Sequence, residues 1–297
     1  MRKSVEDLLK KTIAFKYNLP NGAIEKSIYS TKEDYCYCSL NDIILSKIIY
    51  NALIDYAFNE NEIQDDNLDS LQIEAITQRM RIEETDNEET QLRYGFFGEV
   101  LFNLVLQLFF GSSAIIAKGY FYDILHPEEP KGYDSYHFIM DKKNIQLWFG
   151  EVKFHTSYKS AIDSVFSNIE KAISDSYFRN NLLALTPKKN DLNTSNATIK
   201  SLLDHLRNNP YCKISDLVEN FGLQFTYPIF ITCENLNNYD TTISSIISYI
   251  KNKYPGKSLD IGLNYDLFFI LLPVTNVKKI KQTVLRWIKL KEPLTLS

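Results

Sequence analysis

The sequence predicts an α/β protein in which helices pack on a mixed β-sheet, preceded by a mostly helical N-terminal region. The chain has 297 residues and is 44% apolar, which is enough to form a large buried core. After about residue 90, short apolar segments typical of strands alternate with longer amphipathic segments. Before that point the apolar residues recur mainly at helical spacing. We therefore expect two regions, residues 1–90 and residues 91–297.

The clearest helical pattern of the first region is "SLNDIILSKIIYNALIDYAF", residues 39–58. Ser39 or Asn41 is expected to cap its start, because both side chains accept hydrogen bonds from main-chain N–H groups. The polar segments 61–67 and 83–90 predict loops.

The second region begins with a strongly apolar segment that predicts a helix over residues 93–110. Strands are expected at 113–124, at 133–140 and at 144–155, with the last two joined by the polar turn "DKKN". A long helix is expected over 158–184 and another near 197–208. The segments "YPIFITC" and "YDLFFILLPV" predict two further strands, each with a neighbouring helix. A helix, three strands and then alternating helices and strands indicate helices packed on a mixed sheet.

The composition argues against a membrane-spanning or disulfide-stabilised protein. No apolar segment reaches the roughly 18 residues that a membrane span requires. The N-terminal segment "MRKSVEDLLKK" lacks the apolar core of a signal peptide. The four cysteines form no C-x-x-C pair and are expected to be reduced thiols. These features predict a cytoplasmic protein.

Charge is unevenly distributed along the chain. The net charge is −4, yet residues 60–90 hold eleven acidic residues against two basic ones. The segment "VKKIKQTVLRWIKLKE" near the C-terminus holds six basic residues and one acidic residue. One interpretation is a basic surface for a polyanion together with a separate acidic element. The alternative is that both segments are ordinary solvated surfaces.

The segment "WFGEVKFH", residues 148–155, places two charges in an otherwise apolar strand. Alternate residues of a strand share a face, so Glu151 and Lys153 lie on the face that carries Ile145 and Phe149. Partly buried charges are costly unless they are paired or bind a metal. The acid-x-Lys triplets at 129–131 and 141–143 lie in polar turns and do not share this context.

Asp134 provides a second carboxylate for the same place. It opens the strand before the "DKKN" turn, and the two strands of such a hairpin are antiparallel neighbours. The start of one strand then lies beside the end of the other, which brings Asp134 next to Glu151 and Lys153. Two carboxylates near a lysine suit Mg²⁺. The alternative is that Asp134 caps a turn after Gly132.

Glu99 is a candidate third acid. Within the apolar helix predicted at 93–110, the strongly polar side chains are Glu99, Asn103 and Gln107, which share one helical face. This face is either the solvent side of the helix or the side that faces the site. Gly95 and Gly98 lie beside Glu99 and permit close backbone approach.

These residues resemble the core of the PD-(D/E)XK nucleases. The segments "RYGFFGEVLFNLVL", "GYDSYHF" and "FGEVKFH" are similar to the HamA family, the nuclease subunits of the Hachiman anti-phage defence system. The resemblance covers about residues 93–185. Tyr133 stands where the superfamily name has proline. The resemblance implies a cytoplasmic effector that cleaves DNA with little sequence preference and works with a superfamily-2 helicase subunit, HamB. It implies no membrane association.

The expected mechanism assigns a role to each candidate residue. Asp134, Glu151 and the Val152 carbonyl would hold Mg²⁺, or Mn²⁺ in its place, and Glu99 would hold a second ion. Lys153 would orient or deprotonate the attacking water, or offset charge on the phosphate. Lys159 and the basic C-terminal segment would contact DNA phosphates. His137 is an accessory candidate that reaches the metal only if a bulge shifts its strand.

Two other functions fit the same sequence. The fold is also compatible with a non-catalytic regulatory or DNA-binding module, and with a site-specific restriction endonuclease. Plasmid cleavage distinguishes them, because the outcomes are no cleavage, a smear or discrete bands. The acidic segment 60–90 either masks the basic surface or docks the helicase, and we expect docking because a mobile acidic loop is a weak mask at cytoplasmic salt.

Overall fold

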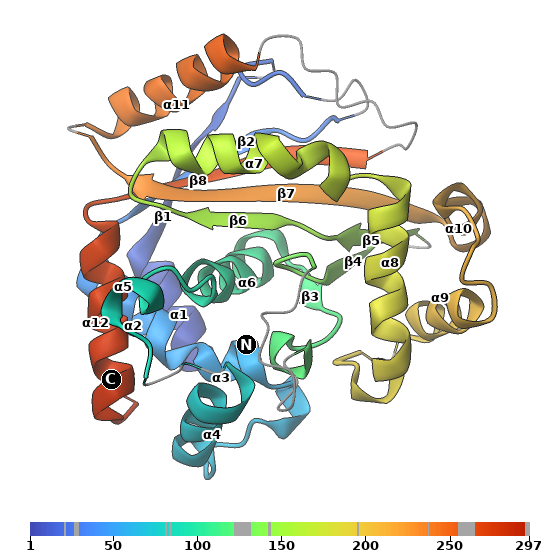
Figure 1. The fold of residues 1–297 in the computed structure, drawn as a ribbon, viewed down its shortest axis with the longest axis horizontal. Helices are drawn as coiled ribbons and strands as arrows, with labels where there is room; N and C mark the ends of the chain where they lie inside the picture. Colours follow the sequence, from blue (N-terminus) through green and yellow to red (C-terminus); the bar gives the residue numbers. More distant parts are fainter. Residues whose placement is uncertain are drawn as a thin grey trace.

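A mixed β-sheet of eight strands organises the protein, as seen in a computed structural model that describes residues 1–20, 22–26, 30–80, 82, 85–121, 132–141, 144–194, 196–236, 238–254 and 265–294 (Figure 1). The strand order is β1-β2-β8-β7-β5-β4-β3, and β6 also pairs with β7. The strands are β1 (Ile13–Leu19), β2 (Asp34–Ser39), β3 (Ser113–Ala114), β4 (His137–Asp141), β5 (Asn144–Trp148), β6 (Glu151–Phe154), β7 (Leu223–Glu234) and β8 (Tyr265–Val274).

The centre of the sheet is parallel and its edges are antiparallel. Strands β2, β8, β7, β5 and β6 run parallel along their shared contacts, whereas β1 pairs antiparallel with β2, and β4 pairs antiparallel with β5 and β3. All ten residues of β8 are buried. Parallel strands of this composition need cover on both faces, and the helices provide it.

Each face of the sheet carries its own apolar core. One core joins the sheet to α7 (Tyr158–Ala172), α8 (Asp175–Leu185), α9 (Ala197–Asn208), α10 (Ile214–Phe221) and α11 (Tyr239–Lys253). The other joins it to α1 (Lys3–Thr12), α2 (Asp42–Asn51), α3 (Leu53–Ala57), α4 (Leu68–Glu74), α6 (Phe96–Phe110) and α12 (Val277–Leu290). Figure 1 shows α7 and α11 on one side of the sheet and α6 on the other. The predicted two-sided cover of a mixed sheet is confirmed.

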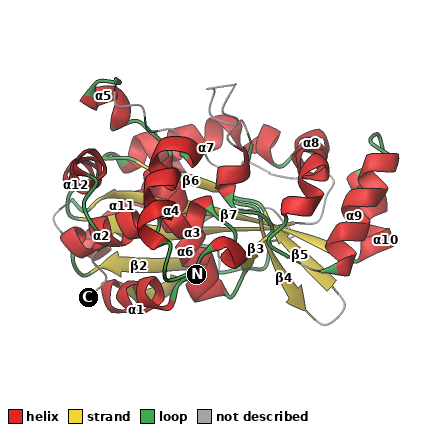
Figure 2. Ribbon diagram, turned by 90° about the horizontal axis from the view of Figure 1, so that it is seen from below, coloured by secondary structure: helices red, strands yellow, loops and turns green. Residues whose placement is uncertain are grey.

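Short helical segments complete the fold. They are the 3₁₀ helices η1 (Glu60–Glu62), η3 (Lys118–Phe121) and η4 (Thr186–Asp191), the π-helical turn η2 (Ala75–Arg79) and the single-turn helix α5 (Glu88–Gln91). Figure 2 shows α5 beside α12. A hydrogen bond of 2.6 Å from the Gln282 side chain to the Glu88 carboxylate joins these two helices.

Several predicted elements are confirmed. The helix expected at 93–110 is α6, the helix near 197–208 is α9, and "YDLFFILLPV" is β8. The hairpin at the "DKKN" turn is antiparallel, with Asp141 opposite Asn144. Asn41, one of the two proposed caps, accepts hydrogen bonds from the N–H groups of Ile43 and Ile44 at the start of α2. All four cysteines are free thiols.

Several secondary-structure predictions were wrong. The strand expected at 133–140 begins only at His137, and the last three residues of the loop expected at 83–90 belong to α5. The strand expected at 113–124 is only β3, followed by η3, and residues 122–124 lie outside the described part of the chain. The helix expected at 158–184 is two helices, because the chain turns at Ile173 and the Ser174 side chain caps α8. The strand expected at 144–155 is interrupted between β5 and β6.

The N-terminal region contains two strands as well as helices. β1 and β2 pair with each other, and β2 joins the main sheet through Tyr35 opposite Ile270 of β8. Six- and seven-residue strands depend on partners distant in sequence, so local helical patterns concealed them. The boundary near residue 90 stays a prediction, but residues on both sides of it share one sheet. No helix in the described ranges has the length and hydropathy needed to cross a bilayer.

Candidate functional site

A break between β5 and β6 creates the candidate site. Trp148 lies opposite Thr226 of β7, and Glu151 lies opposite Ile229, so the register places Gly150 opposite Pro228. Proline has no N–H to donate. The main-chain groups of Gly150 bond elsewhere: its carbonyl accepts from the Asp134 N–H at 3.0 Å and its N–H donates to Ser135 Oγ at 3.0 Å. The break therefore ties the start of the hairpin to the "EVK" strand.

The close approach at this break requires glycine. A Cβ added at Gly150 would lie 2.4 Å from the Pro228 carbonyl oxygen and 2.8 Å from the ring of Phe102. The Asp134 side chain adds a second connection, because its Oδ2 accepts from the Val152 N–H at 2.7 Å. The predicted convergence of Asp134 with residues 151–153 is therefore present in the structure.

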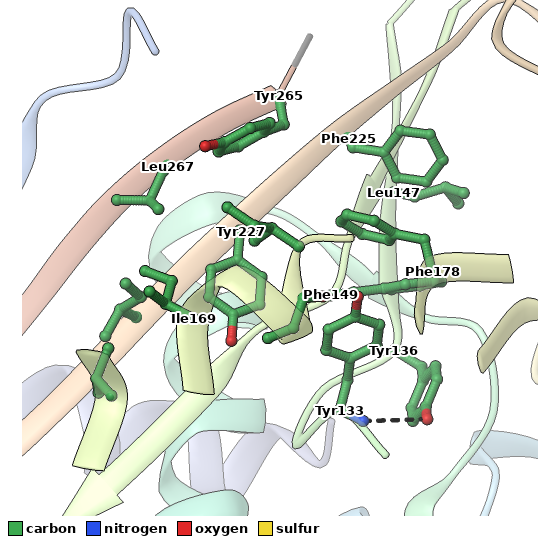
Figure 3. Packing of buried hydrophobic residues seen from close by; sticks show 14 of the residues in the cluster. Tyr133, Tyr136, Leu147, Phe149, Ile169, Phe178, Phe225, Tyr227, Tyr265 and Leu267 are labelled. Atoms are coloured by element: carbon green, nitrogen blue, oxygen red, sulfur yellow. Dashed lines mark hydrogen bonds between the residues drawn. The ribbon is translucent and has the colours of Figure 1, made fainter. Parts of the chain in front are cut away.

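Tyr133 fixes the main chain next to Asp134. Its side chain is fully buried among aromatic rings, with the ring of Phe149 at 5.3 Å between centroids. Figure 3 shows Tyr133 beside Phe149 and Tyr136, with its N–H directed to the Tyr136 hydroxyl at 3.2 Å. The Tyr133 carbonyl accepts from Lys118 Nζ at 2.6 Å. Tyr133 thus serves as a packing anchor next to Asp134.

Glu151 and Lys153 lie on one face of β6 and form an ion pair with each other. Their side chains are 19% and 18% exposed, so the pair is only partly hydrated. Val152 and Phe154 point to the opposite face and pack in the core that contains α6. The alternation predicted for the motif strand is confirmed. The Tyr227 hydroxyl lies 3.5 Å from Glu151 Oε2.

Asp134 is in an environment that disfavours its charge. Burial raises the pKa of its carboxyl well above the ordinary value, and the nearby Glu99 and Glu151 carboxylates raise it further. Lys118 and Lys153 oppose this effect without cancelling it. Three carboxylates thus act on one another around a single buried position, which is an arrangement that a cation would stabilise.

Glu99 faces the interior, not solvent. It is 4% exposed, and its Oε2 accepts a hydrogen bond from the Tyr56 hydroxyl and lies 3.5 Å from Lys118 Nζ. Asn103 on the same helical face is also buried. The solvent-facing interpretation of this face is wrong at Glu99 and Asn103. Gly98 permits the contact between α6 and β6, since a Cβ there would lie 2.9 Å from Val152 Cγ2.

Lys153 remains charged in this setting. Burial alone lowers its pKa, but Glu151, Asp134 and Glu99 raise it, and the net effect is a raised pKa. Lys118, which sequence analysis did not select, is the second buried lysine near Asp134. The sequence feature that could have identified Lys118 is its position as a lysine within the apolar segment "AIIAKGYF", which was predicted to be a strand.

His137 and Lys159 lie apart from the carboxylates. His137 is buried, with Nε2 2.8 Å from Asn103 Oδ1 and Nδ1 2.9 Å from Ser112 Oγ. Both ring nitrogens therefore have protein partners, and burial lowers the pKa of His137 to about 3. It occupies a regular position in β4 opposite Trp148, without the bulge that metal contact requires. Lys159, in the first turn of α7, lies with Nζ 5.8 Å from the ring centre of Tyr249.

A cleft of about 1030 Å³ opens over the site. Glu99, Asp134 and Lys153 line one part of its wall, and Lys278 and Lys281 of α12 line another. The segment from Glu89 to Gly95 forms a further part of its wall. The cleft has the size of a groove for an extended ligand, and both of its main walls carry lysine.

Among the described residues, no three histidine, cysteine, aspartate or glutamate side chains are already arranged as a metal cage. The donor set nevertheless has the chemistry that Mg²⁺ prefers: the Asp134 and Glu151 carboxylates and the Val152 carbonyl are hard oxygen ligands. The hydrogen bond from Val152 uses Oδ2 of Asp134, so Oδ1 is the oxygen available for a cation. These residues fit a divalent metal.

A family model described as HamA matches residues 12–288 of this chain. The chain belongs to the HamA family. HamA is a component of the Hachiman defence system, which implies a partner. All of the predicted site residues lie within the matched range. No curated protein and no solved structure matches the chain.

HamA membership extends the resemblance beyond the motif region. The match begins in α1 and ends in α12, so it includes β1 and β2 and the helix that forms the far wall of the cleft. The N-terminal strands and the C-terminal helix therefore lie within the region that the family model matches.

Proposed function

We propose that this HamA protein is a Mg²⁺-dependent deoxyribonuclease of the PD-(D/E)XK type. It would act as the effector subunit of a Hachiman complex with a superfamily-2 helicase and cleave DNA with little sequence preference. The observation that carries the proposal is the 2.7 Å hydrogen bond from the Val152 N–H to Asp134 Oδ2. It holds an aspartate beside a Glu-x-Lys strand, and Asp134, Val152 and Lys153 line the cleft.

The surrounding topology supports the same assignment. The aspartate lies three residues before β4, which forms an antiparallel hairpin with β5. Strand β6 runs parallel to β7, and helices α6 and α7 flank the motif on opposite faces. Asp134, Glu151 and the Val152 carbonyl would hold the metal, which would polarise the scissile phosphate and lower the pKa of a bound water. Glu99, already bonded to Tyr56 and Lys118, would tune the charge at Asp134 and remains the candidate ligand for a second ion.

The protein's own residues would position the DNA for this reaction. Lys153 carries a raised pKa, which favours donation to a phosphate oxygen over removal of a proton from water. The lysines on the two walls of the cleft would hold the strand by its phosphates, which gives binding without base recognition.

The test is cleavage of supercoiled plasmid by the full chain, with and without its helicase partner, in Mg²⁺ and in EDTA. Glu151→Gln should reduce cleavage by at least about 100-fold, because loss of a metal ligand removes several kcal/mol of charge stabilisation. Its melting temperature should stay close to that of the wild-type chain. Glu219→Gln, an exposed acid on α10, is the matched control and should cleave normally.

The form of the product separates the alternative functions. A smear supports a nuclease with little sequence preference, discrete bands support a restriction endonuclease, and intact plasmid in every condition supports a non-catalytic module. Cleavage by Glu151→Gln at the wild-type rate would refute the site assignment.

A further inference from the structure

Lys281 is a partly buried lysine on α12 that lines the same cleft as Glu99, Asp134 and Lys153. Its Nζ lies 5.3 Å from the ring centre of Phe97 and 5.4 Å from that of Phe154. The same nitrogen donates a hydrogen bond of 2.9 Å to the Leu92 carbonyl. Two aromatic rings and one carbonyl therefore fix the position of this ammonium group at the wall of the cleft.

Three other lysines with largely buried side chains differ from Lys281 in their partners. Lys26, Lys118 and Lys153 each lie within 4 Å of a carboxylate, from Asp34, Glu99 and Glu151 respectively. The ion pairs found among the described residues do not include Lys281. Burial alone lowers its pKa, to about 8. A desolvated ammonium without a carboxylate is costly, so the fold retains an arrangement that an anion in the cleft would stabilise.

A second observation is that Lys281 and Lys153 both affect the pKa of His155. Burial lowers the pKa of His155, which lines the cleft, and the charges of Lys281 and Lys153 lower it further. Both lysines thus act on one imidazole that lines the cleft. Of the six basic residues in the C-terminal segment, Lys278 and Lys281 line the cleft. Lys279, Arg286 and Lys289 are exposed elsewhere on α12.

We propose that Lys281 binds a backbone phosphate of the DNA strand, so that α12 forms a second phosphate-binding wall facing Asp134 and Lys153. This inference rests on the proposed nuclease function and specifies how the substrate is held. Two lysines on opposite walls would hold successive phosphates and align the strand along the cleft. Lys281 would be a positioning residue, because it contacts the substrate away from the reacting phosphate.

The experiment measures binding of a fluorescent DNA duplex to the full chain in the Glu151→Gln background, across a series of salt concentrations. Lys281→Met keeps the aliphatic length and removes the charge. We expect affinity to fall at least about tenfold, as for a hydrogen bond to a charged group. The slope of log affinity against log salt should decrease by about 1, as for one lost phosphate contact. Lys279→Met is the control and should change affinity less than about twofold.

Stability provides a readout that separates the two possible roles of Lys281. If the fold tolerates this ammonium for the sake of a ligand, the melting temperature of Lys281→Met should equal or exceed that of its parent. A lower melting temperature with unchanged affinity and salt slope would overturn the inference by showing a structural role. Lys281→Gln replaces the methionine variant if that variant does not fold.

The remaining outcomes distinguish the inference from the function on which it rests. If the Glu151→Gln chain binds DNA and Lys281→Met binds equally well, the inference fails while the proposed function stands. If the Glu151→Gln chain does not bind DNA, both fail. Millimolar inorganic phosphate is the second probe. If phosphate raises the melting temperature of the parent alone and DNA affinity is the same in both chains, Lys281 holds free phosphate and the assignment to DNA is wrong.

Discussion

Asp134 interacts with the chain at Gly150, with strand β6 and with Glu99 of helix α6. Its main chain bonds Gly150, its side chain bonds Val152, and its pKa is raised by burial and by two other carboxylates. A residue that is costly for the metal-free fold and central to a cleft is typical of a functional site.

This cost predicts a pH-dependent effect of Asp134→Asn. A carboxyl with a raised folded-state pKa gives stability that is present below about pH 4 and lost as the pH rises through the raised pKa. In EDTA at neutral pH, Asp134→Asn should therefore melt higher than the wild-type chain, by on the order of a few degrees. The difference should disappear below about pH 4, where the wild-type carboxyl is protonated in both states.

Melting curves from acid to neutral pH measure this effect. Exposed Asp66→Asn controls for loss of a carboxylate elsewhere. Adding Mg²⁺ at neutral pH should raise the melting temperature of the wild-type chain and leave Asp134→Asn unchanged. An asparagine variant that is less stable than wild type at every pH would contradict this account of Asp134.

The contact between α6 and β6 sets the geometry of the site at the level of elements. Gly98 lies against Val152 and Phe154, and Glu99 follows it directly. Helix α6 can therefore bring Glu99 close to Asp134 only because residue 98 has no side chain.

Gly98→Ala should separate these two elements. The new Cβ would lie 2.9 Å from Val152 Cγ2 and 3.2 Å from Phe154 Cβ, so the helix or the strand must shift. We expect a stability loss of about 1–3 kcal/mol from overpacking. The cleavage rate, measured well below the melting temperature, should fall by more than the fraction of unfolded protein accounts for. The reason is that the shift displaces Glu99 from Asp134.

A second substitution tests whether the clash is the cause. Val152→Ala removes the side chain that the new methyl would meet and leaves the main-chain groups of residue 152 in place. The double variant should recover part of the lost stability and activity, which a double-mutant cycle quantifies. Full activity in Gly98→Ala alone would show that the spacing of α6 and β6 does not control the site.

At the scale of the whole molecule, the acidic segment and the basic C-terminal helix meet at the cleft. Glu88 bonds Gln282 of α12, and Glu89 lines the cleft and pairs with Arg93. The predicted separation of the acidic element from the basic segment is therefore wrong at the C-terminal end of the acidic segment. Glu83 and Glu84 lie outside the described residues. The docking role expected for the segment stays untested, and the position of α5 now favours the masking role.

Neutralising this end of the segment should therefore strengthen DNA binding by the isolated chain. In Glu88→Gln/Glu89→Gln, in the Glu151→Gln background, two negative charges at the cleft mouth are removed. We expect affinity to rise several-fold at low salt, and the gain to shrink as the Debye length falls below about 10 Å. Asp65→Asn/Asp66→Asn, an exposed pair in the same segment, is the control.

The opposite result would support docking. If the double variant binds DNA as its parent does but assembles less well with the helicase partner, the segment is a docking surface. Binding titrations of the isolated chain and of the complex provide both measurements.

Much of the site could be predicted from the sequence, because its signals are local. Strand alternation placed Glu151 and Lys153 on one face, the hairpin brought Asp134 beside them, and helical spacing put Glu99 and Asn103 on one face. The mixed sheet with helices on both faces follows from the same periodicities. These predictions depend on residues that are close in sequence or joined by a short turn.

Only the tertiary structure decided which distant residues complete the site. Lys118 and Lys281 carry no periodic signal that links them to the motif. Contacts with Tyr133 and Leu92 nevertheless hold Lys118 beside Glu99 and Lys281 at the cleft. Strand β2 was missed because its partner β8 is more than 200 residues away, and β1 was missed because it pairs with β2. His137, a candidate by proximity in sequence, bonds Asn103 and Ser112 instead. Local periodicity fixes the face on which a side chain lies, whereas long-range packing determines what that face meets.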